Sequence, residues 1–151
     1  MTTPVTTQIT SAVVTALQAI QTTGGYHTNA GDRVFRGRSE HLEDTEYDRY
    51  PLIRVRSSGD SLAEQRPGLA RITRNIEIQG VISPAQEDYE PELDQLVEDI
   101  FTALLPLTKN RGPLQNIGHQ AQFAEMAWTL EGDAGMVTAT FRLTVAYILQ
   151  I

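Results

Sequence analysis

The alternation of apolar and polar residues is strongest near the end of the chain, from Met136 to Ile151. Every second residue from Val137 to Leu149 is apolar, and most of the residues between them are threonine or arginine. A period of two is typical of a strand with one buried face. At about 3.3 Å per residue the strand would be roughly 50 Å long, which exceeds the usual strand of a small domain. We therefore expect it to bend or to extend beyond its own sheet, and such an extension favours assembly.

Two further segments alternate in the same way. Residues 51–58 place Ile53 and Val55 on one face, and residues 70–83 predict a second strand. The second strand has Ile72, Ile76, Ile78 and Ile82 on one face and Thr73, Asn75, Glu77 and Gln79 on the other. Gly80 interrupts it and predicts a bulge or bend. Between the two strands, residues 59–69 contain two glycines and a proline among polar residues, which predicts a loop.

A closing hairpin is predicted near the C-terminal end. Apolar residues alternate from Ala124 to Leu130, and residues 131–135, with two glycines, form a turn into the final strand. A short strand is predicted at Val34 and Phe35, after a turn at residues 29–32.

Two segments have helical spacing instead. Residues 6–22 repeat apolar side chains every three or four positions until Gly24 and Gly25 end the pattern, and residues 92–105 do so until Pro106. The element order predicts a single α+β domain over residues 1–151, a mostly antiparallel β-sheet of four to five strands with two amphipathic helices packed on one face. The residues expected in its core include Ile100, Phe101, Phe141 and Leu143.

Composition narrows the possible functions. The chain has 151 residues, no cysteine, and a net charge of −7 from 12 basic and 19 acidic side chains. The acidic balance argues against a protein that clamps nucleic acid by releasing counterions from phosphate. We find no signal-peptide pattern and no apolar run of the roughly 18 residues that cross a bilayer, so the chain is expected to assemble inside the cell, without a membrane partner.

The sequence gives little indication of catalysis. His27, His41 and His119 lie in separate non-periodic segments without the spacing of a zinc site. The acidic segment from Glu40 to Asp44 lacks the alternating acids and the turn glycine of a calcium loop. Phosphate-binding and nucleophile-elbow motifs are also missing from the sequence. We therefore expect a non-enzymatic protein with no cofactor and no metal.

Charged residues supply the candidates for interaction. Arg54, Arg56, Arg71 and Arg74 are expected on neighbouring strands, either as a basic stripe for an acidic partner or as cross-strand partners of Glu77 and nearby acids. Residues 38–50 and 59–69 are predicted to be mobile loops that order on docking. The candidate interaction residues are Glu40, His41, Glu43, Asp44, Arg54, Arg56, Arg66, Arg71 and Arg74. Trp128 and Tyr147 are either interface anchors or core, and core is the more common role.

Three segments resemble a known family. An amphipathic N-terminal helix is followed by the sequence GYHTNAG at residues 25–31, by VFRG at residues 34–37, and by YPLIRV at residues 50–55. These segments and the order of elements after them are similar to the tail terminator proteins of long-tailed bacteriophages, also called tail-completion or minor tail proteins. The resemblance spans nearly the whole chain, although its motifs consist of turn residues and hydrophobic pattern.

The resemblance implies a structural virion protein at the tail-neck junction, assembled in the host cytoplasm. Such a subunit forms a homo-oligomeric ring, a hexamer in this family, that caps the tail tube and stops its polymerisation. The implied partners are the tail tube protein and a neck or head-tail connector protein, while DNA passes through the ring without specific binding. The alternatives are another head-tail joining or tail tube subunit, and a small cytoplasmic ligand-binding domain or enzyme.

Overall fold

The computed structural model describes residues 4–36, 51–82, 90–108, 120–131 and 136–150. The elements are α1 (Val5–Gln18), two 3-10 turns η1 (Thr22–Gly24) and η2 (Ala30–Asp32), β1 (Val34–Arg36), β2 (Leu52–Arg66), β3 (Leu69–Ile82), α3 (Glu90–Thr108), β4 (Gln120–Glu131) and β5 (Met136–Gln150). The strands form one five-stranded sheet in the order β1-β2-β3-β5-β4. All neighbouring pairs are antiparallel except β1 and β2. The expected α+β class is confirmed.

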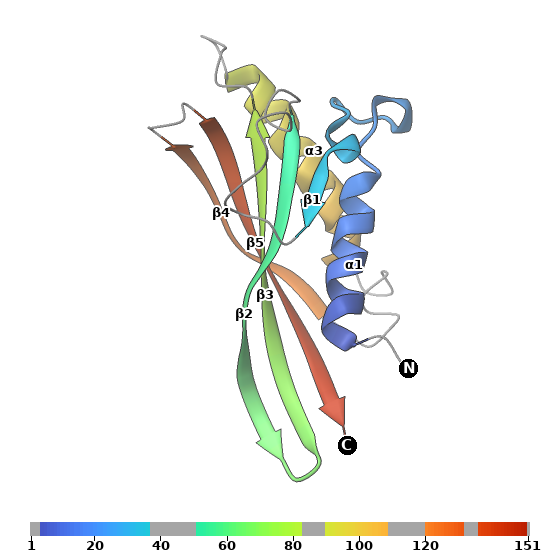
Figure 1. Ribbon diagram of the computed structural model, residues 1–151, viewed down its shortest axis with the longest axis vertical. Helices are drawn as coiled ribbons and strands as arrows, with labels where there is room; N and C mark the ends of the chain where they lie inside the picture. Colours follow the sequence, from blue (N-terminus) through green and yellow to red (C-terminus); the bar gives the residue numbers. More distant parts are fainter. Residues whose placement is uncertain (1–3, 37–50, 83–89, 109–119, 132–135, 151) are drawn as a thin grey trace.

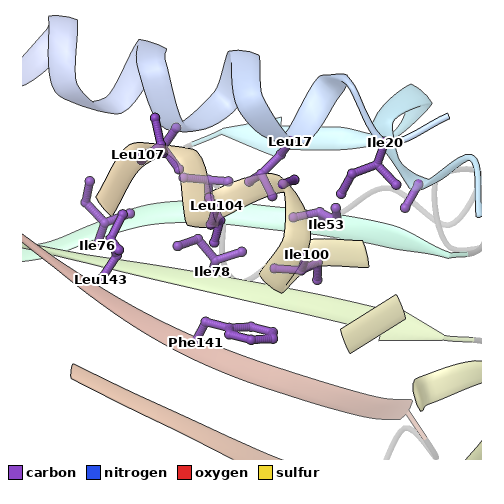
Figure 2. Close-up of a cluster of buried hydrophobic side chains, with 14 of the residues drawn as sticks. Leu17, Ile20, Ile53, Ile76, Ile78, Ile100, Leu104, Leu107, Phe141 and Leu143 are labelled. Atoms are coloured by element: carbon purple, nitrogen blue, oxygen red, sulfur yellow. The ribbon is translucent and has the colours of Figure 1, made fainter. Parts of the chain in front are cut away.

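Both helices cover the same face of the sheet and contact each other (Figure 1). Their apolar stripes meet alternate residues of β2, β3 and β5 in one buried cluster (Figure 2), which contains Leu17, Ile53, Ile78, Leu104 and Phe141 among others. Burial of one helix stripe and one sheet face is the arrangement that their periods of 3.6 and 2 require. The core predicted at Ile100, Phe141 and Leu143 is confirmed, because all three side chains are fully buried.

Phe101 is the exception among the predicted core residues, since 37% of its surface is exposed. The buried stripe of α3 consists of Leu93, Leu96, Asp99, Ile100, Ala103, Leu104 and Leu107. Phe101 follows Ile100 by one residue, which is a rotation of about 100° around the helix, and so it lies at the edge of this stripe. The expectation that Phe101 is core was wrong.

The helix ends also differ from the prediction. α1 ends at Gln18, because its last turn tightens with an Ile20 N–H bonded to the Leu17 carbonyl at 3.1 Å. The Ile20 carbonyl then accepts from the Gly31 N–H at 2.9 Å. At its other end α3 continues past Pro106 to Thr108. Leu107 is buried, so packing holds the last turn although the proline lacks an N–H.

Gly80 lies in a regular part of the ladder opposite Ile53, so the predicted bulge at this residue was wrong. A Cβ atom at Gly80 would lie 2.7 Å from Ile100 Cδ1 and 2.9 Å from Leu96 Cδ2. Glycine is therefore required here because α3 approaches the sheet closely. The irregularities of the ladder lie on β2 instead, between Ser57 and Gly59 and between Leu62 and Glu64.

Residues 59–69 do not form the predicted loop. β2 continues to Arg66, β3 begins at Leu69, and only residues 67–68 turn between them, with Gly68 at φ 76°. The polar composition that suggested a loop belongs to strand residues that face solvent, so polarity here reports exposure rather than irregular structure.

Candidate assembly surface

Three strands extend past the two helices as a bare arm. The arm consists of residues 57–66 of β2, 69–75 of β3 and 144–150 of β5, and its tip is the lowest part of the sheet in Figure 1. At its base, Val145 and Tyr147 still belong to the buried core. Residues 57–66 are exposed apart from the half-buried Glu64, whereas Leu52 to Val55 on the same strand are buried. Toward its tip, the sheet has no covering layer and offers exposed residues to a partner.

The arm carries three of the large exposed apolar side chains of the described residues. Leu62 is 58% exposed, Ile148 45% and Leu149 42%. Leu149 lies an even number of residues from the buried Phe141 along β5, so both side chains lie on the helix-side face of the sheet, whereas Ile148 lies on the other face. Apolar side chains exposed on both faces of a strand are unusual for a solvated edge and are typical of a surface that is covered on assembly.

Near its base the arm holds a small polar cluster. Arg74 Nη1 lies 3.3 Å from Asp60 Oδ2, and both residues share a sheet face with Tyr147. Burial raises the pKa of the Tyr147 phenol above its usual value, and the nearby Asp60 carboxylate raises it further, while Arg74 partly offsets both effects. Tyr147 is only 3% exposed, so it belongs to the core rather than to an exposed anchor.

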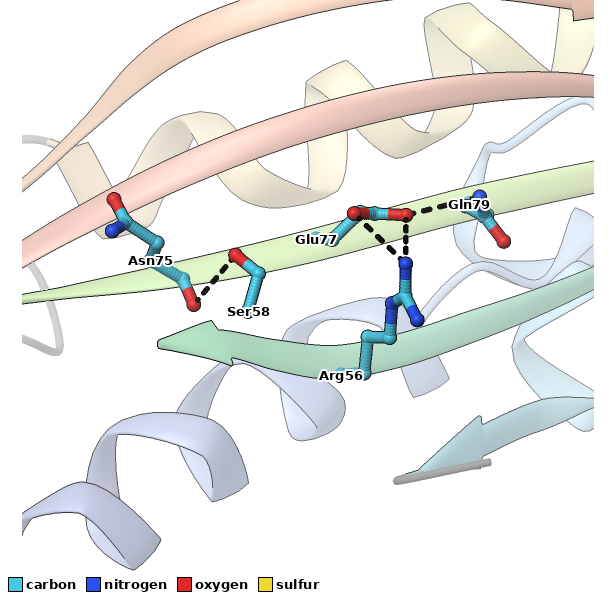
Figure 3. A network of polar contacts seen from close by, with 5 residues as sticks. All are labelled: Arg56, Ser58, Asn75, Glu77 and Gln79. Carbon is cyan, nitrogen blue, oxygen red and sulfur yellow. Dashed lines mark hydrogen bonds and ion pairs between the residues drawn. The ribbon is translucent and has the colours of Figure 1, made fainter. Parts of the chain in front are cut away.

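The sheet face opposite the helices carries a second polar cluster (Figure 3). Arg56 Nη2 donates to Glu77 Oε1 and Oε2 at 3.1 and 3.3 Å, and Gln79 Nε2 donates to Glu77 Oε1 at 3.0 Å. Glu77 is nearly buried, whereas 42% of the Arg56 side chain is exposed. A buried carboxylate needs such donors, because an isolated charge in the interior is costly. Cross-strand pairing with Glu77, one of the two predicted roles of the arginines, is thus present for Arg56.

The four strand arginines do not form one continuous stripe. Arg54, Arg56 and Arg71 lie on the face away from the helices, and Arg74 lies on the helix side. Arg54 is buried, Arg71 is exposed, and Arg74 is bound to Asp60. Arg66, near the tip of the β2–β3 hairpin, donates from Nε to Glu64 at 2.8 Å. The predicted docking loop 38–50 lies outside the described residues, and with it lie Glu40, His41, Glu43 and Asp44.

A buried carboxylate that sequence reasoning missed holds the segment 27–31. Asp99 of α3 accepts hydrogen bonds from the backbone N–H of His27 at 2.9 Å and of Thr28 at 2.8 Å, and from the Thr28 hydroxyl at 2.7 Å. Gly31 packs so closely on α1 that a Cβ atom would lie 2.5 Å from the Gln18 carbonyl oxygen. Asp99 stands on the apolar stripe of α3, and an acid in that position was the available signal for a buried polar contact. The segment therefore has a structural role.

Within the described ranges, no group of three or more histidine, aspartate or glutamate side chains is placed to hold a metal ion. None of the helices in that part of the chain combines the length and the hydrophobicity needed to cross a membrane.

In comparisons with known proteins, no protein-family profile matches the chain, and no curated protein sequence matches it significantly.

Proposed function

We propose that this protein is a tail terminator of a long-tailed bacteriophage, a structural subunit whose hexameric ring caps the tail tube and stops its polymerisation. The observation that carries the proposal is the bare arm, in which strands of 14 and 15 residues extend past both helices. Its exposed apolar residues, Leu62, Ile148 and Leu149, remain in water in a single subunit. A protein that works by assembly gains stability when such residues are covered.

The placement of the arm fits contact with a tube end. The helices, the loop held by Asp99 and the covered half of the sheet form a body with its own core, and the arm projects from one end of this body (Figure 1). A subunit of this shape can pack its body beside its neighbours in a ring while the arms reach the tail tube below. The opposite end of the body would face the neck or head-tail connector protein.

The charge of the chain suits a ring around a DNA channel. With a net charge of −7 per subunit, the wall of such a channel repels the phosphates of the passing duplex, so that DNA moves through without being held. The ring would be a virion component at the tail-neck junction, assembled in the host cytoplasm.

Capping of tube ends is the decisive experiment. Purified protein is mixed with tail tubes of the cognate phage, and electron microscopy should show a ring at tube ends, while tubes grown in its presence should stop lengthening. The variant Leu62→Ser/Leu149→Ser removes exposed apolar surface from the arm and should fold normally but cap poorly. Leu105→Ser is the matched control, because Leu105 is a similarly exposed apolar residue that lies on α3. Tubes that never carry the wild-type protein at their ends would contradict the proposal.

A tail tube or another head-tail joining subunit is the second candidate, and the same projecting arm favours it. The two roles differ in where the protein is found. A tube subunit polymerises into long stacks of rings, whereas a terminator stops at a single ring and remains at the end of the tube.

A further inference from the structure

A β-bulge lies where the buried parts of β2 and β3 end. The ladder pairs Ser57 with Ile76 and then Gly59 with Asn75, so Ser58 is an extra residue in the register. On β3, Ile76 is buried, whereas no residue from Leu69 to Asn75 is. On β2, the residues from Ser57 onward are exposed or half-buried. The bulge therefore marks the boundary between the body and the arm.

The residues of the bulge suit its geometry. Ser58 Oγ donates to the Asn75 carbonyl at 3.3 Å (Figure 3), which attaches the extra residue to the neighbouring strand. Gly59 has a φ of 130°, a value that residues with a Cβ atom rarely adopt. A Cβ atom at Gly59 would meet nothing within 4 Å. Glycine is therefore required here by the backbone conformation and not by a lack of space.

The extra residue also decides which face of the sheet the next residues occupy. Arg56 lies on the face away from the helices, and in a regular strand every second residue after it would lie there too. Because Ser58 adds one residue, Asp60 lies on the helix-side face instead, opposite Arg74. Arg74 Nη1 is then 3.3 Å from Asp60 Oδ2. In a regular strand of the same sequence, Asp60 would lie on the other face and this ion pair could not form.

We propose that the bulge at Ser58 is a rigid joint, which holds the arm in one orientation relative to the body. Bulges bend their strand and increase its right-handed twist, and Figure 1 shows a strong twist of the sheet between body and arm. The Asp60–Arg74 ion pair locks the joint from the arm side. Only 17% of the Arg74 side chain is exposed, so this pair is held in place more closely than an ion pair between two surface side chains.

A rigid joint has a consequence for binding. An arm of fixed orientation loses less conformational entropy when it binds than a mobile arm does, and preorganisation of this kind strengthens binding. The exposed side chains of Leu62 and Leu149 would then meet a partner from one preset direction. The joint is a property of the single chain, so it does not depend on the proposed function.

Distances between two spin labels test the joint. The chain has no cysteine, so Thr15→Cys on α1 and Ser61→Cys on β2 introduce the only thiols. Both positions are exposed, and Ser61 lies between the two irregularities of β2. Double electron–electron resonance then measures the distribution of distances between body and arm. The doubly labelled protein should give a single narrow distribution, and a broad or multiple distribution would overturn the proposal.

Removal of the extra residue should change this distance. Deletion of Ser58 leaves the residues from Gly59 to Leu62 with their partners on β3, so the expected result is a shift of the mean distance by more than the width of the original distribution. Deletion of Ala63 is the matched control, because Ala63 is the extra residue of the second irregularity and lies beyond the label. An unchanged mean after deletion of Ser58, or an equal shift after deletion of Ala63, would overturn the proposal.

The lock is tested by Asp60→Asn, which removes the charge that Arg74 contacts and should broaden the distribution. Glu64→Gln is its control, because it weakens an ion pair nearer the tip, with Arg66 at 2.8 Å, and should leave the distribution unchanged. Thermal unfolding confirms that each variant is folded. If deletion of Ser58 prevents folding, Gly59→Ala replaces it and should shift or broaden the distribution. An Asp60→Asn distribution as narrow as the original would show that the ion pair does not lock the joint.

Discussion

The two halves of β2 differ although one continuous strand forms both. The residues from Leu52 to Val55 are buried on both faces, while most of the residues from Ser57 to Arg66 are exposed. The first half lies under the helices and gains stability from a packed core, whereas the second half is held by backbone pairing with β3 and by a few ion pairs. One end of the sheet therefore stabilises the fold, and the other end remains exposed for binding.

Truncation within β5 should give the largest difference between the two halves. Phe141→Ala removes a fully buried ring and should lower the free energy of unfolding by about 3 to 5 kcal/mol. Leu149→Ala, on the same strand and the same face but in the arm, should lower it by less than about 1 kcal/mol. Urea denaturation of both variants measures this difference. Equal losses would show that the arm is as tightly packed as the body.

Loss of the Asp99 charge on α3 should cause the second-largest decrease in the free energy of unfolding. Asp99→Asn keeps the shape of the side chain but removes the charge that three hydrogen bonds approach, and it should cost about 1.5 to 3 kcal/mol. Asp94→Asn, at an exposed position of the same helix, is the control and should be within about 0.5 kcal/mol of wild type. Amide hydrogen exchange at His27 and Thr28 would locate the effect. Unchanged protection at these two amides would contradict it.

The close approach of α3 to β3 should be visible at Gly80. Gly80→Ala places a Cβ atom against Ile100 and Leu96, and overpacking of this kind costs about 1 to 3 kcal/mol. Gly24→Ala is the control, because a Cβ atom there lies at 3.7 Å or more from the nearest atom outside its chain neighbours. If thermal unfolding of the two variants coincides, the sheet and the helix are farther apart than described.

The smallest expected effect is on pH dependence at the base of the arm. The pKa of Tyr147 is raised in the folded state above its usual 10.0, so the folded protein retains the phenolic proton at a pH where the unfolded chain loses it. The associated stability is present below pH 10.0 and falls as pH rises through the folded pKa. Tyr147→Phe should flatten this part of the curve of unfolding free energy against pH. An unaltered alkaline slope in the variant would assign the decline to other groups.

Hydrophobic periodicity predicted the fold well where one face of an element is buried. The strands containing Ile78 and Phe141 and the helix containing Ile100 all follow from alternation or three-four spacing, because burial selects apolar residues at the period of the backbone. The prediction failed for residues 59–69 for the same physical reason. A strand exposed on both faces has no such selection, and its sequence is that of a loop.

The candidate surface was harder to predict than the fold. Sequence placed Arg56 and Glu77 on neighbouring strands but could not give their register, and one residue of shift would have separated them onto opposite faces. The close contact at Gly80 depends on the distance between a helix and a sheet, which no local pattern encodes. Asp99 was detectable as an acid within an apolar stripe, but its acceptance of the His27 and Thr28 amides depends on tertiary structure.

The contacts of Asp99 have a consequence for the order in which the chain folds. Asp99 is separated from Thr28 by 71 positions in the sequence and from His27 by 72. The backbone N–H groups of His27 and Thr28 therefore obtain their acceptor only after a long segment of chain has been closed. Closure of long segments slows folding, and during synthesis the N-terminal residues emerge well before α3 exists. During synthesis, the N-terminal helix and the turn after it should therefore lack their native packing until the second helix has been translated and has docked.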